Sequence, residues 1–529
     1  MKLSEPNLKA LGKREQEVVQ RLDRSFGRAP EQPVIGGGNI HYEVSDRTKA
    51  IHCGGIGVVS QLVERVGLQE AIDDKVKVLR RHLPYHESDH VLAVAYNILT
   101  GGSRLEDLET MRQDVGLLEA LGAPRLPDPT TAGDFTRRFA QSDILDLMES
   151  INQVRCDVWR MQRNENRCRS QFKIAGPRLQ GEECFAEAVL DIDGTIAETT
   201  GECKAGMDLS YKKTWGYAPL LVSLANTGEP LFLVNRSGNS ASQSEAAPWL
   251  DRAITLMEPY SRRVCLRGDT AFSLTGEFDG WSQRGIDFVI GYDAHPNIVA
   301  LANALPESDW EELERPAKYE VSTQPRQRRE NAKEECVRAH NYTNRRLQGE
   351  QVAQFLYRPG KCRREYRMVV VRKNLQVTKG QEQLLEEVRY FFYITNRTDL
   401  SAAQVVLFAN DRCNQENLIE QLKNGVHAMN LPVNDLLSNW AYMVMASLAW
   451  SLKAWCGLLM PNRSLGAELV KMEFRRFLRK FILVPCQIAR SGRRLVYRVL
   501  GYSAHLGDWL RFSKHLCLWP RPRQRPSRC

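Results

Sequence analysis

Residues 187–200, EAVLDIDGTIAETT, carry a short apolar run that ends in two aspartates and a glycine. The run predicts a β-strand, and side chains two residues apart on a strand lie on the same face. Asp191 and Asp193 therefore share a face, with Ile192 on the other. A carboxylate at the end of a buried strand acts as a metal ligand, a catalytic base or a cap. An ordinary Asp-Gly turn fits this segment equally well, so the rest of the chain has to decide.

The composition describes a large, basic, globular protein. The chain has 529 residues, 43% hydrophobic, and a formal charge of +9, which favours an acidic polymer as partner. Its thirteen cysteines are irregularly spaced and no signal peptide is evident, so we expect a reducing cytoplasm. The apolar stretch 439–461 is interrupted by Lys453 and several polar residues. It predicts a buried helix and no membrane span.

The N-terminal part is predicted to be all-α. Apolar residues recur at spacings of three and four across 56–159, which predicts a helical domain over residues 1–165. The segment LPDPTTAGDFTRRF offers Thr130 or Thr131 as a helix cap and then Arg137 and Arg138 as contacts to phosphate. A surface helix with solvated arginines fits this segment as well.

Three histidines, His82, His86 and His90, follow one another at four-residue spacing in the helical part. Such spacing resembles a metal-binding face, but Pro84 interrupts the first interval. The nearby acids, Glu87 and Asp89, fit the first turn of a helix. We therefore interpret the cluster as helix capping.

From residue 187 onward the pattern becomes α/β. Strands are predicted at 187–192, 218–225 and 230–235, with the turn NTGE between the last two, followed by helices alternating with strands at 263–266 and 286–292. Three antiparallel strands followed by helical crossovers predict an RNase H-like core. The predicted divisions are the helical domain at 1–165, the core at 180–295, a basic β-rich insertion at 296–385, the rest of the core at 386–460, and a basic C-terminal region at 461–529.

Three carboxylates fall where a two-metal site needs them. Asp193 or Asp191 ends the first strand, Asp269 follows the fourth, and Glu416 lies on a helix after the sheet resumes. Such a cluster is repulsive without cations, and Mg²⁺ or Mn²⁺ prefers carboxylate oxygens. Two ions about 3.5–4 Å apart would support in-line displacement at a phosphodiester.

The chain resembles DDE transposases of bacterial insertion sequences, in the group with a Tyr-Arg-Glu-Lys signature, and is most similar to the insertion-sequence family numbered 1380. Arg412, Glu416 and Lys423 have the spacing of that signature, whereas Ala409 stands at its tyrosine position. The segments LDIDGT and RGDTAF resemble the motifs of the first two acids, and the family's Asp-x-Thr pattern selects Asp193 over Asp191. YKKTWGYAPL and RSGN are also similar, so the resemblance covers roughly residues 50–460.

The resemblance implies a catalytic triad of Asp193, Asp269 and Glu416, two Mg²⁺ or Mn²⁺ ions, and phosphate contacts from Arg412 and Lys423. It also implies terminal inverted repeats and target DNA as partners, with the helical domain at 1–165 binding the DNA ends. A homodimer in the synaptic complex and a location in the bacterial cytoplasm at the nucleoid are implied as well. Two alternatives remain. DIDGT also fits haloacid-dehalogenase-type phosphatases, although the predicted hairpin disagrees with their parallel sheet. Ala409 also fits an inactive DNA-binding relic.

Overall fold

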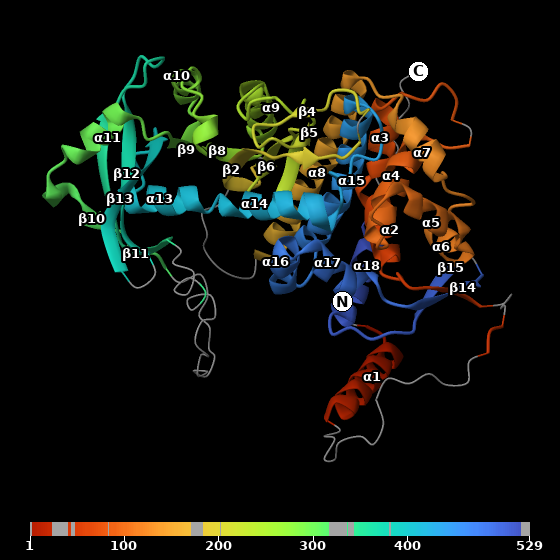
Figure 1. Cartoon of the computed structure of the whole chain (residues 1–529). Coiled ribbons are helices and arrows are strands. Elements are labelled where there is room, and N and C mark those ends of the chain that lie inside the picture. The colour runs from red at the N-terminus through yellow and green to blue at the C-terminus, as the bar shows by residue number, and fades with distance from the viewer. Residues whose placement is uncertain are drawn as a thin grey trace.

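The centre of the protein is a nine-stranded mixed sheet. The computed structural model describes residues 3–23, 41–43, 48–82, 84–170, 183–201, 203–316, 336, 343–379, 382–492 and 494–519. In spatial order the strands are β10 (Glu311–Glu312), β11 (Thr343–Tyr357), β12 (Tyr366–Lys379), β13 (Glu382–Thr395), β9 (Asp287–Tyr292), β8 (Ser261–Gly268), β2 (Phe185–Gly194), β6 (Leu220–Leu224) and β7 (Glu229–Val234) (Figure 1).

Strand directions around β2 agree with the prediction from the sequence. β2, β6 and β7 are successively antiparallel, whereas β8 pairs parallel to β2 and β9 parallel to β8. β6 and β7 are joined by a tight turn in which Gly228 adopts a φ of 64°, a conformation that favours glycine. Helices α9 (Ala246–Met257) and α10 (Phe278–Gln283) provide the crossovers to β8 and β9. The antiparallel neighbour of β2 disagrees with the phosphatase alternative.

The β-rich segment after β9 extends the sheet. β11, β12 and β13 form a long antiparallel meander, and β13 pairs antiparallel to β9, with Phe392 opposite Tyr292. The strand expected at 390–396 is the second half of β13. Two further elements flank the meander: α11 (Pro296–Asn303) and α13 (Ala402–Asn410). Most of the basic stretch predicted here, 317–335, lies outside the described residues.

The long apolar segment forms α15 (Leu436–Leu458), which is buried almost throughout. It packs on β7 and on the N-terminal helices α4 (Glu87–Leu99) and α8 (Gln141–Ser170). The indole of Trp440 donates to the Leu233 carbonyl at 2.6 Å, and that of Trp450 to the Gly228 carbonyl at 2.7 Å. In the described residues, no helix is long and apolar enough to span a membrane. The buried-helix prediction is therefore confirmed.

The N-terminal helices and the C-terminal region share one hydrophobic core. Strand β1 (Lys49–Ile51) pairs with β14 (Cys486–Ser491), which forms a hairpin with β15 (Arg494–Val499). Helix α18 (Leu506–Cys517) packs on α2 (Ile56–Val66). The other elements here are α1 (Glu5–Asp23), α3 (Leu68–Lys75), α5 (Leu108–Gln113), α6 (Val115–Leu121), α7 (Pro129–Thr136), α16 (Arg463–Lys471) and α17 (Phe474–Phe477). Elements from the N-terminal and C-terminal regions thus bury their apolar faces against each other.

A buried ion pair joins these helices to the sheet. Glu229, at the start of β7, is fully buried and accepts from Arg155 Nε at 3.0 Å. The same carboxylate accepts from the indoles of Trp159 at 3.0 Å and Trp455 at 2.7 Å. A buried carboxylate is tolerated when donors of this kind replace water. This contact links α8, β7 and α15.

Candidate active site

Three acidic residues from separate elements surround one guanidinium. Asp193 lies at the end of β2, and Asp269 follows β8 directly. Glu416 lies in the first turn of α14 (Cys413–Glu420), whose N-cap residue is Arg412. The Arg412 guanidinium is 2.9 Å from Asp193 Oδ2 and 3.5 Å from Glu416 Oε1. All three acids act electrostatically on Arg412, so the fold brings together the four residues that the motifs singled out.

The sequence around Asp269 explains how that carboxylate is held. Its side chain accepts from the Ala271 backbone N–H at 2.9 Å and so caps a short 3₁₀ turn, Thr270–Phe272. Gly291 on β9 lies directly against this turn, because a Cβ there would come 2.9 Å from the Thr270 nitrogen. The turn after β8 therefore requires a glycine on the neighbouring strand.

The charges in this cluster shift the pKa of its members. Burial raises the pKa of Asp193 to about 6, with Arg412 opposing the rise and the charge of Asp269 adding to it. Burial lowers the pKa of the Arg412 guanidinium, but the three carboxylates outweigh it and the pKa is raised overall. Glu416 is 60% exposed, so the cluster opens to solvent on its side. The arrangement is an acidic site with one compensating cation.

Asp191, the alternate first ligand, is engaged elsewhere. Its carboxylate accepts from Arg267 Nε at 2.6 Å and from a terminal nitrogen at 2.8 Å, and both side chains are almost fully buried. Asp191 and Arg267 are register partners on the parallel strands β2 and β8. Arg267 also donates to the Phe408 carbonyl at 2.8 Å. Both oxygens of Asp191 thus bind Arg267, and Arg267 in turn joins β2 and β8 to α13. Asp191 is therefore occupied, although it shares a strand face with Asp193.

Gln415 fixes the helix that carries Glu416. Its buried side chain donates from Nε2 to the backbone carbonyls of Asp191 at 3.0 Å and Leu221 at 3.2 Å. Gln415 and Arg267 were not predicted from the sequence, because a side chain that reaches a distant strand leaves no periodic signal. The position of Gln415 next to Glu416 was the one sequence feature that pointed to it.

On a regular α-helix, the signature spacing of Arg412, Glu416 and Lys423 would place all three residues on one face. Lys423 instead lies beyond the end of α14. Helix α14 ends at Glu420, and residues Gln421–Gly425 form a π-helical turn. Burial lowers the pKa of Lys423, and Lys212 adds to this effect whereas Glu198 and Glu420 oppose it. The wider turn changes the angular position of the lysine relative to the preceding helix.

Comparison with known proteins identifies the family. Residues 50–505 match the family model of the transposase DDE domain, group 1. The chain belongs to the DDE transposases. A search of curated proteins found no match. Among solved structures, the chain is similar to piggyBac transposase in a synaptic complex with hairpin DNA, with 11% identity, 82% of this chain and 86% of that chain covered, and a TM-score of 0.32.

A cleft of about 350 Å³ lies beside the acids of this transposase. Asp269 and Arg412 line it, together with Ala409, the residue at the signature's tyrosine position. Tyr393 from β13 lines the same cleft, and burial raises its pKa while Arg315 and Arg412 oppose the rise. A phenol from another element therefore reaches the surroundings of the missing tyrosine. Sequence spacing gave no indication of it.

The arginines predicted to contact phosphate lie at the end of α7, among the N-terminal helices. Arg137 is exposed and paired with Asp134, whereas Arg138 is exposed on the rim of a cleft of about 600 Å³. The helix cap is Asp128, which accepts from Thr131 N at 2.9 Å, so the prediction of Thr130 or Thr131 is wrong. In Figure 1, α7 lies at the opposite end of the molecule from β11–β13.

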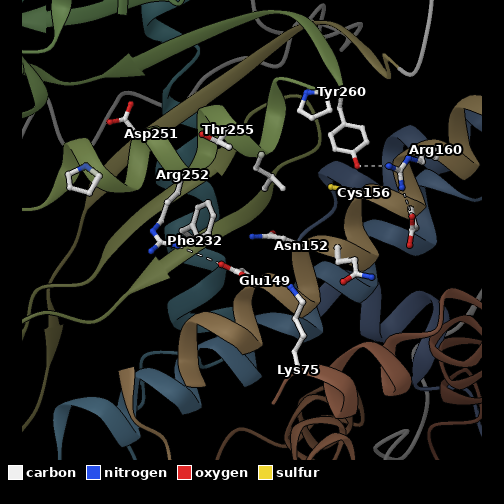
Figure 2. A pocket seen from close by; sticks show the side chains of 15 residues that line it. Lys75, Glu149, Asn152, Cys156, Arg160, Phe232, Asp251, Arg252, Thr255 and Tyr260 are labelled. Atoms are coloured by element: carbon white, nitrogen blue, oxygen red, sulfur yellow. Dashed lines mark hydrogen bonds and ion pairs between the residues drawn. The ribbon is translucent and has the colours of Figure 1, made fainter. Parts of the chain in front are cut away.

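Another cleft, of about 820 Å³, separates α8 from α9 and contains none of the three acids. Figure 2 shows two pairs of side chains that face each other: Arg252 lies 3.7 Å from Glu149, and Arg160 donates to the Tyr260 hydroxyl at 2.8 Å. Charge is balanced within this cleft. The three carboxylates that share Arg412 lie at β2, β8 and α14 instead.

Proposed function

We propose that this protein is a transposase of a bacterial insertion sequence, of the family numbered 1380, with an RNase H-like core. It would cut DNA at the terminal inverted repeats of its element and join the 3′ ends to target DNA. The observation that carries the proposal is the convergence of Asp193, Asp269 and Glu416 on Arg412 from β2, β8 and α14. Family membership supports phosphoryl transfer on DNA.

The donor atoms fit Mg²⁺ or Mn²⁺. All three acids offer carboxylate oxygens, the ligands that these hard cations take. Asp193 Oδ2 faces Arg412, a cation already placed where positive charge is required. The three acids would hold two metal ions once Arg412 is displaced from Asp193. When bound, the metals supply activation of the attacking water or 3′-hydroxyl and stabilisation of the leaving oxygen.

The protein's own residues would position the DNA. Arg412, released from Asp193, would contact a phosphate near the cut, and Lys423 would contact a neighbouring phosphate. Planar guanidinium groups bind phosphate oxygens through two parallel hydrogen bonds. Gln415 would keep Glu416 in place through its bonds to β2 and β6. Asp191 would act as a structural residue.

Cleavage of DNA that carries the element's terminal repeat tests this function. Purified protein with Mg²⁺ should cut at the repeat, and Asp193→Ala, Asp269→Ala and Glu416→Ala should each lose cleavage while still binding the DNA. Glu420, one turn beyond Glu416, is exposed and bonded to Asn424, so Glu420→Gln is the matched control. Binding without cleavage in the wild type would favour the inactive relic.

Further partners follow from this function. Two DNA ends must be held together, so a homodimer in the synaptic complex is proposed, working at the bacterial nucleoid. Basic residues, including Arg137 and Arg138, would bind backbone phosphates and release counterions. DNA affinity should therefore fall steeply as salt rises. An affinity independent of salt would contradict phosphate binding by these residues.

A further inference from the structure

A small group of metal-ligand side chains lies far along the chain from the acidic cluster, where the segment after α3 enters α4 (Figure 1). His82 belongs to that segment, His86 is the N-cap residue of α4, and Glu87 is its first residue. One ligand atom from each lies within 4.8 Å of the other two. The two imidazole rings stack with centroids 4.7 Å apart. The three ligand atoms thus lie close enough together to share one ion.

Glu87 is the decisive member of the group. Its side chain is 1% exposed, and Oε1 accepts from the Leu79 backbone N–H at 3.0 Å. The other oxygen, Oε2, is buried and accepts no hydrogen bond from the described residues. It lies 3.2 Å from His82 Nε2, which is charged only when the ring is protonated. A buried carboxylate oxygen left in this state is costly, and a cation between the three donors would remove the cost.

The surroundings add negative charge. Asp73 accepts from the backbone N–H of Ser88 at 2.8 Å and from its hydroxyl at 2.9 Å, and it acts electrostatically on His86 and Glu87. Asp89 accepts from the His86 backbone N–H at 2.9 Å. The N-terminus of α4 disfavours a cation, but these carboxylates oppose that effect. The capping predicted for Asp89 is therefore confirmed and leaves the His82–Glu87 contact unexplained.

His90 is not part of this group, despite the four-residue spacing. Its ring is buried and stacks on Phe135 with centroids 4.2 Å apart. Burial lowers its pKa to about 4. The donor set is therefore two histidines and one glutamate, which the spacing of the three histidines did not indicate.

We propose that His82, His86 and Glu87 form a binding site for Zn²⁺ or a similar transition-metal ion. Two imidazole nitrogens and one carboxylate oxygen, with water in the fourth position, suit Zn²⁺, whereas Mg²⁺ prefers oxygen ligands alone. The metal ties the segment before α4 to the helix. That segment carries Arg80 and Arg81, which line the same cleft of about 600 Å³ as Arg138. The site therefore fixes the position of a basic surface.

Co²⁺ titration of the full-length protein in excess Mg²⁺ tests the site, because Co²⁺ in such a site absorbs visible light and Mg²⁺ competes for the acidic cluster. Wild type should bind one equivalent that Zn²⁺ displaces. His82→Ala and Glu87→Gln should lose this absorption, and Asp193→Ala should keep it. His295 is exposed and is also an N-cap residue, so His295→Ala is the matched control for His86→Ala and should bind as wild type.

Thermal unfolding separates loss of metal from loss of folding. Without metal, His82→Ala should melt as the wild type does, since His82 precedes the helix. Zn²⁺ should raise the melting temperature of the wild type but not that of His82→Ala, because a ligand stabilises only a folded state that binds it. Co²⁺ uptake by His82→Ala equal to that of wild type, or no uptake by wild type, would overturn the proposal. This site is independent of the proposed catalytic function.

Discussion

Acidification should weaken metal binding at the acidic cluster through Asp193. Burial raises the pKa of this carboxyl to about 6, so it carries a proton over a range where an ordinary aspartate is ionised. A protonated carboxyl is a poor ligand for Mg²⁺ or Mn²⁺. Metal binding and proton binding therefore compete at Asp193 near neutral pH.

The size of the effect follows from the ionised fraction. With a pKa of about 6, Asp193 is about 90% ionised at pH 7 and about 10% ionised at pH 5. Apparent metal affinity should fall about tenfold between these values. An aspartate at its ordinary pKa of 3.8 would lose almost none of its ionised form over the same range.

Mn²⁺ binding to the full-length protein, measured by isothermal titration calorimetry at several pH values, provides the assay. Zn²⁺ at a low fixed concentration would occupy the histidine site, so that its titration does not contribute. Asp193→Asn should bind Mn²⁺ weakly, with little dependence on pH. A wild-type affinity that is the same at pH 5 and pH 7 would refute the reasoning.

The same pKa predicts the direction of a stability change. Folded Asp193 keeps its proton up to about pH 6, whereas the unfolded chain loses it near pH 3.8. The protonated Asp193 side chain therefore stabilises the folded state fully below pH 3.8, and this stabilisation is lost as pH rises through 6. The rise of the pKa of Asp193 from 3.8 to about 6 corresponds to about 3 kcal/mol of folding free energy. Urea unfolding of wild type and Asp193→Asn should show their free-energy difference changing by about this amount across the window.

Three further predictions test the fold and the site. Glu229→Gln leaves the buried Arg155 charge without a counterion, so the free energy of unfolding in urea should fall by about 3–5 kcal/mol; a change near zero would show that the ion pair is dispensable. Asp191→Asn should destabilise the protein by a similar amount yet leave Mn²⁺ affinity unchanged, and loss of Mn²⁺ binding would show that Asp191 is a ligand. Glu416→Gln should abolish cleavage of repeat DNA while Glu420→Gln retains it, and the reverse result would place the third acid one turn later.

Local sequence patterns predicted much of the fold. The strand at 187–192, the turn NTGE and the buried helix over 439–461 were predictable, because alternation, glycine and apolar runs act over neighbouring residues. The order of the strands in the sheet around β2 followed from their connections. Arg412 and the three acids around it were indicated by the family motifs alone, without any knowledge of contacts between them.

Contacts between distant segments were not predictable. The strand pattern placed Asp191 and Asp193 on one face and the family motif favoured Asp193, but the contact of Asp191 with Arg267 on the neighbouring strand was not predictable. The π-helical turn that carries Lys423 was not predictable either, because placing Lys423 by its spacing from Glu416 assumes a regular α-helix. The same is true of Tyr393, which reaches the cleft near Ala409 from a strand of the meander.

The sequence by itself determined which chemical groups this transposase has and the local elements that bear them, since strand and helix patterns are written in adjacent residues. The tertiary structure decided their partners: Asp193 faces Arg412, Asp191 faces Arg267, and Glu87 faces His82. Whether a carboxylate serves as a metal ligand or as a structural residue depends on its burial and on the nearest cation. Both are properties of chain segments that meet only when the protein is folded.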